Sequence, residues 1–492
     1  MGFLANIFIL SRLGLGMGTG RRIYKNTVYL GIAEVVSRVL QFVVMLYAAR
    51  LLSQGNFGRF SFALSLSFIA VILADLGINT LLIREISRNK DLASKFFINA
   101  FSAKIALSIF AFFIIFGTLN LLGYPAGTRQ IVYIIWLFTI ISTFTELFYS
   151  IFRAFEMMFY DAMLKILRMV ILAAASLYIL FQGYGVVVFS YAFVFTEAVV
   201  VLAAFAIASA KFIRLGFDVD IPFIISLVKK SLPFGLAIVF GGVYFYIGSV
   251  ILSKIGGDAE VAVFSAAYNI ALALLFVPAV YTNAIYPVLS RYHQESRAEL
   301  KLLYERSFKY LYIIGIPISV GIYMLAKRII LLLYGPEYAA SSIALQIIAI
   351  YLFLKFINFL LGIVLSSIDR QNKRMLGQGL TAAFSVLLNI ILIPLIGFAG
   401  AALSTLITEV FLFMIYYIFV SKSWYFYNFT KVLLKPAAAA VIMGAFIKYT
   451  GFGLTATIIL SAIIYITSIF ALKTFDSQDY KIMRTILKNE NV

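Results

Sequence analysis

The sequence predicts an all-α membrane protein with about 14 transmembrane helices, arranged as two parallel six-helix lobes followed by two C-terminal helices. Three observations carry this prediction: long apolar stretches recur along the chain, Lys and Arg collect in every second gap between them, and the first half resembles the second. Hydrophobic residues make up 63% of the 492 residues and charged residues 12%, unlike the composition of a soluble domain. Lipid is therefore expected to surround much of the chain.

The apolar stretches are each long enough to cross a bilayer. A helix of about 20 apolar residues spans a hydrocarbon layer of about 30 Å, because each residue adds about 1.5 Å. The predicted spans are 27–49, 57–83, 92–122, 130–152, 157–182, 184–210, 232–254, 260–289, 308–333, 339–368, 375–396, 398–420, 433–450 and 452–472.

The distribution of Lys and Arg orients these helices. If the amino terminus is cytoplasmic, roughly 30 basic residues fall on the inner side and 7 on the outer side, which is the positive-inside pattern. We therefore expect a multi-pass protein of the cell membrane with both termini in the cytoplasm. A formal net charge of +19 would suggest nucleic acid in a soluble protein. Here the basic loops face anionic lipid, so membrane lipids are expected partners and nucleic acid is not.

Several motifs needed for common chemistries are absent from the sequence. There is no Gly-rich loop ending in Gly-Lys-Ser/Thr, so ATP hydrolysis is not expected. There is no cysteine, which excludes thiol catalysis and Cys-bound metal. The chain is therefore predicted not to be an enzyme and to hold no cofactor. Its energy would come from a gradient or a partner, with Na⁺ or H⁺ as the coupling ion.

The two halves of the chain show an internal repeat. Residues 163–197 align without a gap on 375–409, and 52–88 align on 252–291 with a few residues inserted. These matches pair spans 1–2 with 7–8 and spans 5–6 with 11–12, so each repeat has six helices. An even number of helices returns the chain to its starting side, so the two repeats are parallel and related by an axis along the membrane normal.

The repeat sets the expected domain boundaries. Two lobes that face each other can open a shared site to either side by rocking, although duplicated helices could instead scaffold a complex. Spans 13 and 14 have no partner in the repeat and are predicted to be an addition. The expected parts are a cytoplasmic or interfacial N-terminal segment at 1–26, an N-lobe with spans 1–6 at 27–210, a cytoplasmic linker at 211–231, a C-lobe with spans 7–12 at 232–420, spans 13–14 at 421–472 and a cytoplasmic tail at 473–492.

Span 1 carries polar residues along one helical face. Thr27, Gly31, Glu34, Arg38 and Gln41 follow one another at spacings of four, three, four and three, which places them in one stripe. A charge at the bilayer centre costs at least about 2.5–3.5 kcal/mol unless it is paired or hydrated. This stripe should therefore face protein or a water-filled cavity. The alternative is a Glu34–Arg38 pair that neutralises itself and does nothing more.

Arg38, Lys104 and Lys355 are the cations placed deepest in the predicted spans. Fixed positive charges in a low-dielectric cavity suit an anionic group such as phosphate or diphosphate, so these three are the candidate substrate-binding residues. For Lys104 and Lys355, snorkelling or pairing with a carboxylate is an equal alternative. Glu34 and Asp75 are the candidates for tuning these cations or for binding a coupling proton or Na⁺.

Four further charged residues in the spans are predicted to be structural. Glu146, Arg153, Glu197 and Glu409 are expected near helix ends, where solvated roles prevail. Glu197 and Glu409 occupy equivalent places in spans 6 and 12 of the repeat.

Several motifs resemble those of a known family. They are Tyr47–Leu52, Asn56–Gly58, Ala74–Ile78, Ile83–Ile86, Tyr334–Tyr338 and Gly397–Ala402. In this order, and with the plan of fourteen spans, they resemble the polysaccharide flippase branch of the multidrug/oligosaccharidyl-lipid/polysaccharide (MOP) exporter superfamily over nearly the whole chain. The resemblance implies a MATE-like fold whose two lobes work by alternating access.

The resemblance also implies a function. It predicts a secondary-type transporter, a flippase that moves lipid-linked oligosaccharide on a polyprenyl or dolichyl phosphate or diphosphate carrier across the cytoplasmic membrane, for polysaccharide or glycan assembly. Expected partners are this lipid-linked sugar and glycosyltransferases or a polymerase, and the protein is expected to be a monomer. Ser37–Leu40 is similar to the first-helix motif of lipid II flippases, in which the Arg contacts the headgroup, which supports Arg38. Val44 stands where that branch has a second Arg, so lipid II itself is not expected.

Two other functions stay open. The drug-exporting branch shares the fold and often uses first-helix carboxylates for cation coupling, so Glu34 keeps a cation-coupled multidrug antiporter of the MATE type as the alternative. Efflux of cationic compounds and an acidic cavity would favour it. The third class is a non-transporting scaffold or glycosyltransferase subunit, which lobes packed tightly without a central cavity would favour.

Overall fold

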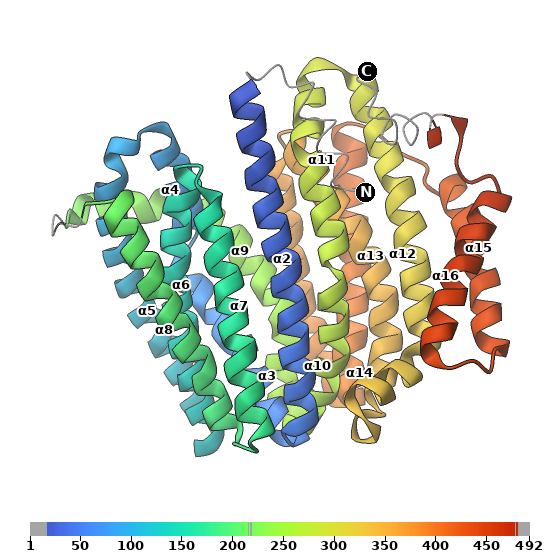
Figure 1. Ribbon diagram of the computed structural model, residues 1–492, viewed down its shortest axis with the longest axis horizontal. Coiled ribbons are helices and arrows are strands. Elements are labelled where there is room, and N and C mark those ends of the chain that lie inside the picture. Colours follow the sequence, from blue (N-terminus) through green and yellow to red (C-terminus); the bar gives the residue numbers. More distant parts are fainter. Residues whose placement is uncertain (1–16, 215, 217–218, 478, 481–492) are drawn as a thin grey trace. The chain divides into compact units, whose positions relative to one another are not determined.

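The computed structural model describes residues 17–214, 216, 219–477 and 479–480. These residues form helices joined by short turns, with no strand among them (Figure 1), which confirms the predicted all-α fold. In chain order the elements are α2 (Met17–Leu51), α3 (Gln54–Asp75), α4 (Ile78–Arg88), η1 (Lys90–Leu92), α5 (Ala93–Leu121), α6 (Ala126–Ala154), α7 (Met158–Phe181), α8 (Val186–Lys211), α9 (Ile221–Ile255), α10 (Asp258–Leu274), α11 (Phe276–Glu295), α12 (Arg297–Tyr334), η2 (Pro336–Tyr338), α13 (Ser341–Ser367), α14 (Gln371–Ser423), α15 (Thr430–Tyr449) and α16 (Leu454–Ala471).

Thirteen helical segments of the described chain are long and apolar enough to cross a membrane. One of them, Gln371–Ser423, consists of two helices joined at a kink, where Ile396 and Gly397 leave the helical conformation. Counting its halves separately gives the fourteen predicted crossings, so this is a multi-pass membrane protein. The predicted division between spans 11 and 12 is confirmed.

The kink in α14 has local causes. Pro394 removes one backbone donor from the helix, and Gly397 takes a φ of 56°, a conformation that strains a residue with a Cβ. The Glu260 carboxylate of α10 accepts a hydrogen bond from the Phe398 N–H at 2.7 Å. It thereby caps the N-terminus of the second half of α14. These residues end one crossing and start the next.

A second break divides the predicted span 57–83, which was expected to be one continuous helix. α3 ends at Asp75, and Leu76 and Gly77 then take positive φ values of 42° and 79° before α4 begins at Ile78. The break leaves Asp75 at the C-terminal end of α3, where the helix dipole disfavours a carboxylate. Asp75 therefore needs a cation beside it.

The helices group into two compact units by their contacts. The unit called here the N-unit comprises residues 26–266 and 378–401, and the C-unit consists mainly of 267–377 and the described residues from 402 onward. Residues 232–266 and 378–401 belong to the C-lobe by the repeat but are grouped with the N-unit by contacts. The repeat reflects how the sequence was duplicated, whereas the units group residues by their contacts in one conformation. The two divisions need not coincide, so the lobe boundaries stay a prediction.

In the N-unit, α6 contacts α3, α7 and α8 and supplies much of the core. Phe148, Tyr149 and Phe152 of α6 are buried in this core. Phe60 of α3 packs edge-on against Phe189 of α8, with ring centroids 4.9 Å apart. This packing holds α6, α7 and α8 together and fixes the positions of the polar side chains that they carry.

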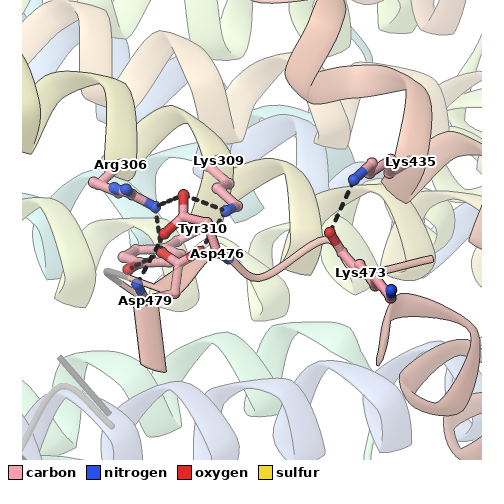
Figure 2. A network of polar contacts seen from close by, with 7 residues as sticks. All are labelled: Arg306, Lys309, Tyr310, Lys435, Lys473, Asp476 and Asp479. Carbon is pink, nitrogen blue, oxygen red and sulfur yellow. Dashed lines mark hydrogen bonds and ion pairs between the residues drawn. The ribbon is translucent and has the colours of Figure 1, made fainter. Parts of the chain in front are cut away.

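In the C-unit, α12 packs against α13, α15 and α16, and the chain after α16 returns to α12 (Figure 2). Arg306 Nη1 of α12 lies 2.5 Å from an Asp476 oxygen and 2.6 Å from an Asp479 oxygen, while Lys309 and Tyr310 also donate to Asp479. These contacts, called here the C-terminal anchor, attach the segment that follows α16 to α12. α15 and α16 confirm predicted spans 13 and 14.

The C-terminal anchor also has an electrostatic signature. Although burial opposes ionisation, the hydrogen bonds from Arg306 and from the Asp479 N–H hold the pKa of Asp476 well below its usual range. Lys435 of α15 adds a hydrogen bond of 2.8 Å to the Lys473 carbonyl oxygen. The predicted N-terminal segment 1–26 and tail 473–492 otherwise lie partly outside the described residues.

Candidate functional site

Arg38 and Glu34 form an ion pair on the membrane-spanning part of α2. Arg38 Nε donates to Glu34 Oε1 at 2.8 Å, and each side chain is 44% exposed. The two residues are one helical turn apart, which lets them meet without help from another helix. Because nearly half of each side chain lies outside the protein interior, the guanidinium keeps donors that a ligand, water or lipid can use.

Lys104 and Asp75 are also brought together, within the N-unit. Lys104 of α5 is fully buried, and its Nζ lies 2.7 Å from Asp75 Oδ1 at the end of α3. The same Nζ donates to the Thr143 carbonyl oxygen at 2.8 Å and to the Thr143 hydroxyl at 2.9 Å. Thr143 thus accepts two hydrogen bonds from the ammonium group, and Asp75 supplies its counter-charge. The structure therefore gives Asp75 the cation that its place at a helix end requires.

Lys355 lies in the C-unit beside a different carboxylate. Its Nζ is 3.3 Å from Glu409 Oε2, and Asn358 Nδ2 donates to Glu409 Oε1 at 2.7 Å and to the Glu409 carbonyl oxygen at 3.0 Å. Glu409 is fully buried, so the expectation of a solvated carboxylate near a helix end is wrong for this residue. Donors from α13 make that burial possible.

Each of the three candidate cations thus stands beside a carboxylate. Arg38 and Lys104 belong to the N-unit and Lys355 to the C-unit. The pairing that was an alternative for the two lysines is present in this conformation, while a role in binding substrate stays a prediction. No group of three or more His, Cys, Asp or Glu within the described ranges is arranged to hold a metal ion.

A network of charged residues in α6 and α7 was not predicted. Asp161 is fully buried and lies 2.6 Å from Arg153 Nε and 3.1 Å from Lys165 Nζ, and Arg153 Nη2 lies 3.4 Å from Glu146 Oε2. The sequence contained one signal for it, the spacing of four residues between Asp161 and Lys165 on one helical face. Glu146 and Arg153 were expected in solvated roles, and they are instead part of this partly buried network.

Glu197 of α8 lies deeper in the same unit. It is fully buried, and its nearest cation is Arg168 of α7, with Oε2 and Nη1 3.7 Å apart. The expectation that Glu197 is solvated near a helix end is therefore wrong. Its place near the middle of α8, not at an end, is the physical reason.

Two family models match the chain. The model described as a polysaccharide biosynthesis protein matches residues 23–293, which is more than half of the chain. The MatE model matches residues 233–395. Together they cover most of the described helices.

Two proteins are similar to the chain over most of their length. The "Putative O-antigen transporter" of Escherichia coli (strain K12) is 26% identical over 406 residues, which covers 78% of this chain and 93% of the relative. The "Capsular polysaccharide biosynthesis protein CapF" of Staphylococcus aureus is 22% identical over 418 residues, which covers 81% of this chain and 99% of the relative. The first name refers to an O-antigen and the second to a capsular polysaccharide.

Solved structures show the same fold. The lipid II flippase MurJ in an inward closed conformation matches with a TM-score of 0.73 at 17% identity, covering 89% of this chain and 97% of MurJ. An inward-facing multidrug resistance MATE family transporter of the MOP superfamily matches with a TM-score of 0.63 at 15% identity, covering 81% of this chain and 98% of that one. These likenesses confirm the expected MATE-like arrangement of helices.

Proposed function

Because the chain belongs to the polysaccharide biosynthesis protein family, we propose that it is a flippase that moves lipid-linked oligosaccharide across the cytoplasmic membrane by alternating access. The carrier would be a polyprenyl or dolichyl phosphate or diphosphate, and the product would serve polysaccharide or glycan assembly. The names of the Escherichia coli and Staphylococcus aureus relatives support this substrate class.

The structural observation that carries the proposal is the Arg38 guanidinium, which stays 44% exposed within a membrane-spanning helix. A guanidinium offers five donors in a fixed fork that matches phosphate oxygens. The Glu34 carboxylate satisfies part of this fork and keeps the charge neutral until an anionic headgroup arrives. Arg38 is therefore the proposed first contact for the phosphate or diphosphate.

Lys104 and Lys355 would act later in the cycle. Both ammonium groups hold a carboxylate in this conformation, Asp75 and Glu409 respectively. A headgroup phosphate would reach them by exchanging with that carboxylate, which requires a second conformation of the unit. Glu34 and Asp75 remain the proposed tuning residues, and either would bind Na⁺ or H⁺ after losing its cation.

The proposed setting follows from the sequence. The positive-inside bias favours a cell-membrane protein with both termini cytoplasmic, working as a non-enzymatic monomer beside glycosyltransferases or a polymerase. The runner-up, a cation-coupled multidrug antiporter, is favoured by one observation, the match of the MatE model to residues 233–395.

Reconstituted full-length protein tests the proposal. Liposomes would carry a fluorescent oligosaccharide on a polyprenyl diphosphate, and a membrane-impermeant glycosidase would report how much of it reaches the other leaflet. Wild type should flip it, and Arg38→Ala should slow flipping about tenfold or more, the effect of losing a charge-assisted contact.

Arg88→Ala is the matched control, because Arg88 is 68% exposed at the end of α4. It should flip at the wild-type rate. Full activity in Arg38→Ala would remove Arg38 from the mechanism. Failure of wild type to flip the lipid, together with efflux of cationic dyes from cells, would favour the antiporter instead.

A further inference from the structure

Two buried polar side chains and one partly buried one gather in the N-unit between α6, α7 and α8 without satisfying one another. Both carboxylate oxygens of Glu197, the Tyr149 hydroxyl and Arg168 Nε lack a hydrogen-bond partner. Glu197 and Tyr149 are fully buried. Thr145 lies near Glu197, but its hydroxyl donates to the Ile141 carbonyl oxygen at 3.2 Å. This group of side chains is called here the Glu197 site.

An ionised carboxylate in this setting is costly. A buried charge is tolerated when hydrogen bonds and a close counter-charge replace water, and Glu197 has only Arg168 at 3.7 Å. Its repeat equivalent in the C-unit, Glu409, is equally buried but receives donors from Asn358 and Lys355. Of these two carboxylates, Glu197 is the one that protonation stabilises. The neutral acid needs no counter-charge, and its hydroxyl can donate a hydrogen bond.

The charged groups around the Glu197 site favour a proton over a metal cation. The helices packed against α8 are α3, α6 and α7. α7 places the positive Arg168 beside the carboxylate, which would repel Na⁺, and α6 contributes Glu146 and Tyr149. The charged residues of α3 are engaged elsewhere: Arg59 pairs with Asp258 and Asp75 with Lys104.

Ionisable side chains also connect the Glu197 site to the end of α6. Lys165, Asp161, Arg153 and Glu146 follow one another at separations of 3.1, 2.6 and 3.4 Å. Arg153 is 26% and Glu146 36% exposed, so this end of the series reaches the surface of the protein. Glu146 also acts electrostatically on Arg168. Because arginine keeps its proton, the series holds charge beside the Glu197 site and is not itself a proton path.

We propose that Glu197 is the proton-binding residue of this transporter and that Arg168 transmits its charge state to the Glu34–Arg38 pair. α2 lies along α7, where Tyr29 packs against Phe159 and Tyr47 against Phe181. The turn of α2 that carries Glu34 and Arg38 therefore lies near the level of Arg168. A hydronium ion gives its proton to one Glu197 oxygen, which makes the carboxylic acid and leaves a water molecule. Arg168 then loses its nearest counter-charge and draws Glu34 toward itself.

This step couples the proton to the anionic lipid, and in this respect the inference rests on the proposed function. When Glu34 turns to Arg168, the Arg38 guanidinium loses the carboxylate that lies 2.8 Å from its Nε. It then binds a headgroup phosphate in place of this carboxylate. The added proton raises the local charge by one, and the anionic headgroup compensates it. Each ligand therefore strengthens binding of the other.

Infrared difference spectroscopy on the full chain in lipid nanodiscs tests the proton site without any substrate. Raising the pH should remove a carboxylic-acid C=O band from the wild-type spectrum. Glu197→Gln should lack this band, while the matched control Glu409→Gln should keep it. A band that persists in Glu197→Gln, or its absence from wild type at every pH, would overturn the assignment.

A second variant covers the case in which Glu197→Gln does not fold. Glu197→Asp keeps a carboxyl group in a shifted position, so its C=O band should move in frequency or titrate at a different pH. An identical band and titration would overturn the proposal.

Transport then tests the coupling. In liposomes holding the fluorescent lipid-linked oligosaccharide, an imposed pH gradient should accelerate flipping by wild type and leave the rate of Glu197→Gln unchanged. An equal acceleration in Glu197→Gln would refute the coupling. If wild type flips no such lipid, the proposed function fails, while the infrared titration still decides whether Glu197 binds a proton.

Discussion

Glu197 in the N-unit and Glu409 in the C-unit stand at equivalent positions of the internal repeat, and both are fully buried. Their surroundings differ. Glu409 accepts a hydrogen bond from Asn358 at 2.7 Å and lies 3.3 Å from Lys355, whereas Glu197 accepts none and lies 3.7 Å from Arg168. The same position in the repeat therefore holds a satisfied carboxylate in one unit and an unsatisfied one in the other.

The difference follows from the helix beside each carboxylate. If the offset that relates 163–197 to 375–409 is extended to the preceding helices, Lys355 and Asn358 of α13 correspond to Thr143 and Glu146 of α6. Both α13 side chains donate to Glu409, while Thr143 accepts from Lys104 and Glu146 offers only an acceptor when ionised. A carboxylate retained through a duplication is thus structural where the neighbouring helix supplies donors, and is free to respond to a proton where it does not.

The largest effect is expected from removing the cation of the satisfied pair. Lys355→Met leaves Glu409 buried without its counter-charge and should lower the free energy of unfolding by about 3–5 kcal/mol. The double variant Lys355→Met/Glu409→Gln should recover most of this loss, since no buried charge remains. Denaturant unfolding of the purified protein measures both, and a single variant as stable as wild type would break the comparison.

A smaller effect should distinguish the two carboxylates directly. Glu409→Gln leaves Lys355 without its acceptor charge and should cost about 1.5–3 kcal/mol. Glu197→Gln removes a charge that receives no hydrogen bond, and it should change the free energy of unfolding by less than about 1 kcal/mol. The two unfolding curves, recorded in the same detergent, sharpen the comparison. A greater loss of unfolding free energy in Glu197→Gln than in Glu409→Gln would reverse the comparison.

The smallest effect concerns the C-terminal anchor of the C-unit. Because the folded pKa of Asp476 is depressed, its contribution is complete above the unfolded pKa of about 3.9 and is lost as the pH falls through the folded value. Between about pH 8 and about pH 5 the stability that the C-terminal anchor contributes should therefore stay constant. Hydrogen exchange of the amides at residues 474–477, corrected for intrinsic rates, measures this. Deprotection within that range would contradict the assignment.

Features that depend on local sequence were predictable. The fourteen crossings followed from apolar length alone, since a bilayer imposes one length on every span. The Glu34–Arg38 pair followed from a spacing of four residues on one helix. The division of α14 followed from the gap between two apolar stretches, where Pro394 and Gly397 stand.

Features that depend on packing were not predictable. The partners of Lys104 and Lys355 come from other helices, so their identity required the tertiary arrangement. The break after Asp75 was missed because Gly is common within membrane helices, and Gly77 alone did not mark it. Glu197 and Glu409 lie near the middles of the predicted spans 184–210 and 398–420. Their assignment to helix ends was therefore wrong on the sequence itself, and only their burial and their partners required the tertiary arrangement.

The C-terminal anchor has a practical consequence for anyone who handles this protein. Asp479 is fully buried among three side chains of α12, so a chain shortened before this residue would leave Arg306 and Lys309 only the half-exposed Asp476 as a carboxylate. The loop between α14 and α15 is no better a place to cut, because its Trp424 and Tyr427 pack against Tyr304 of α12.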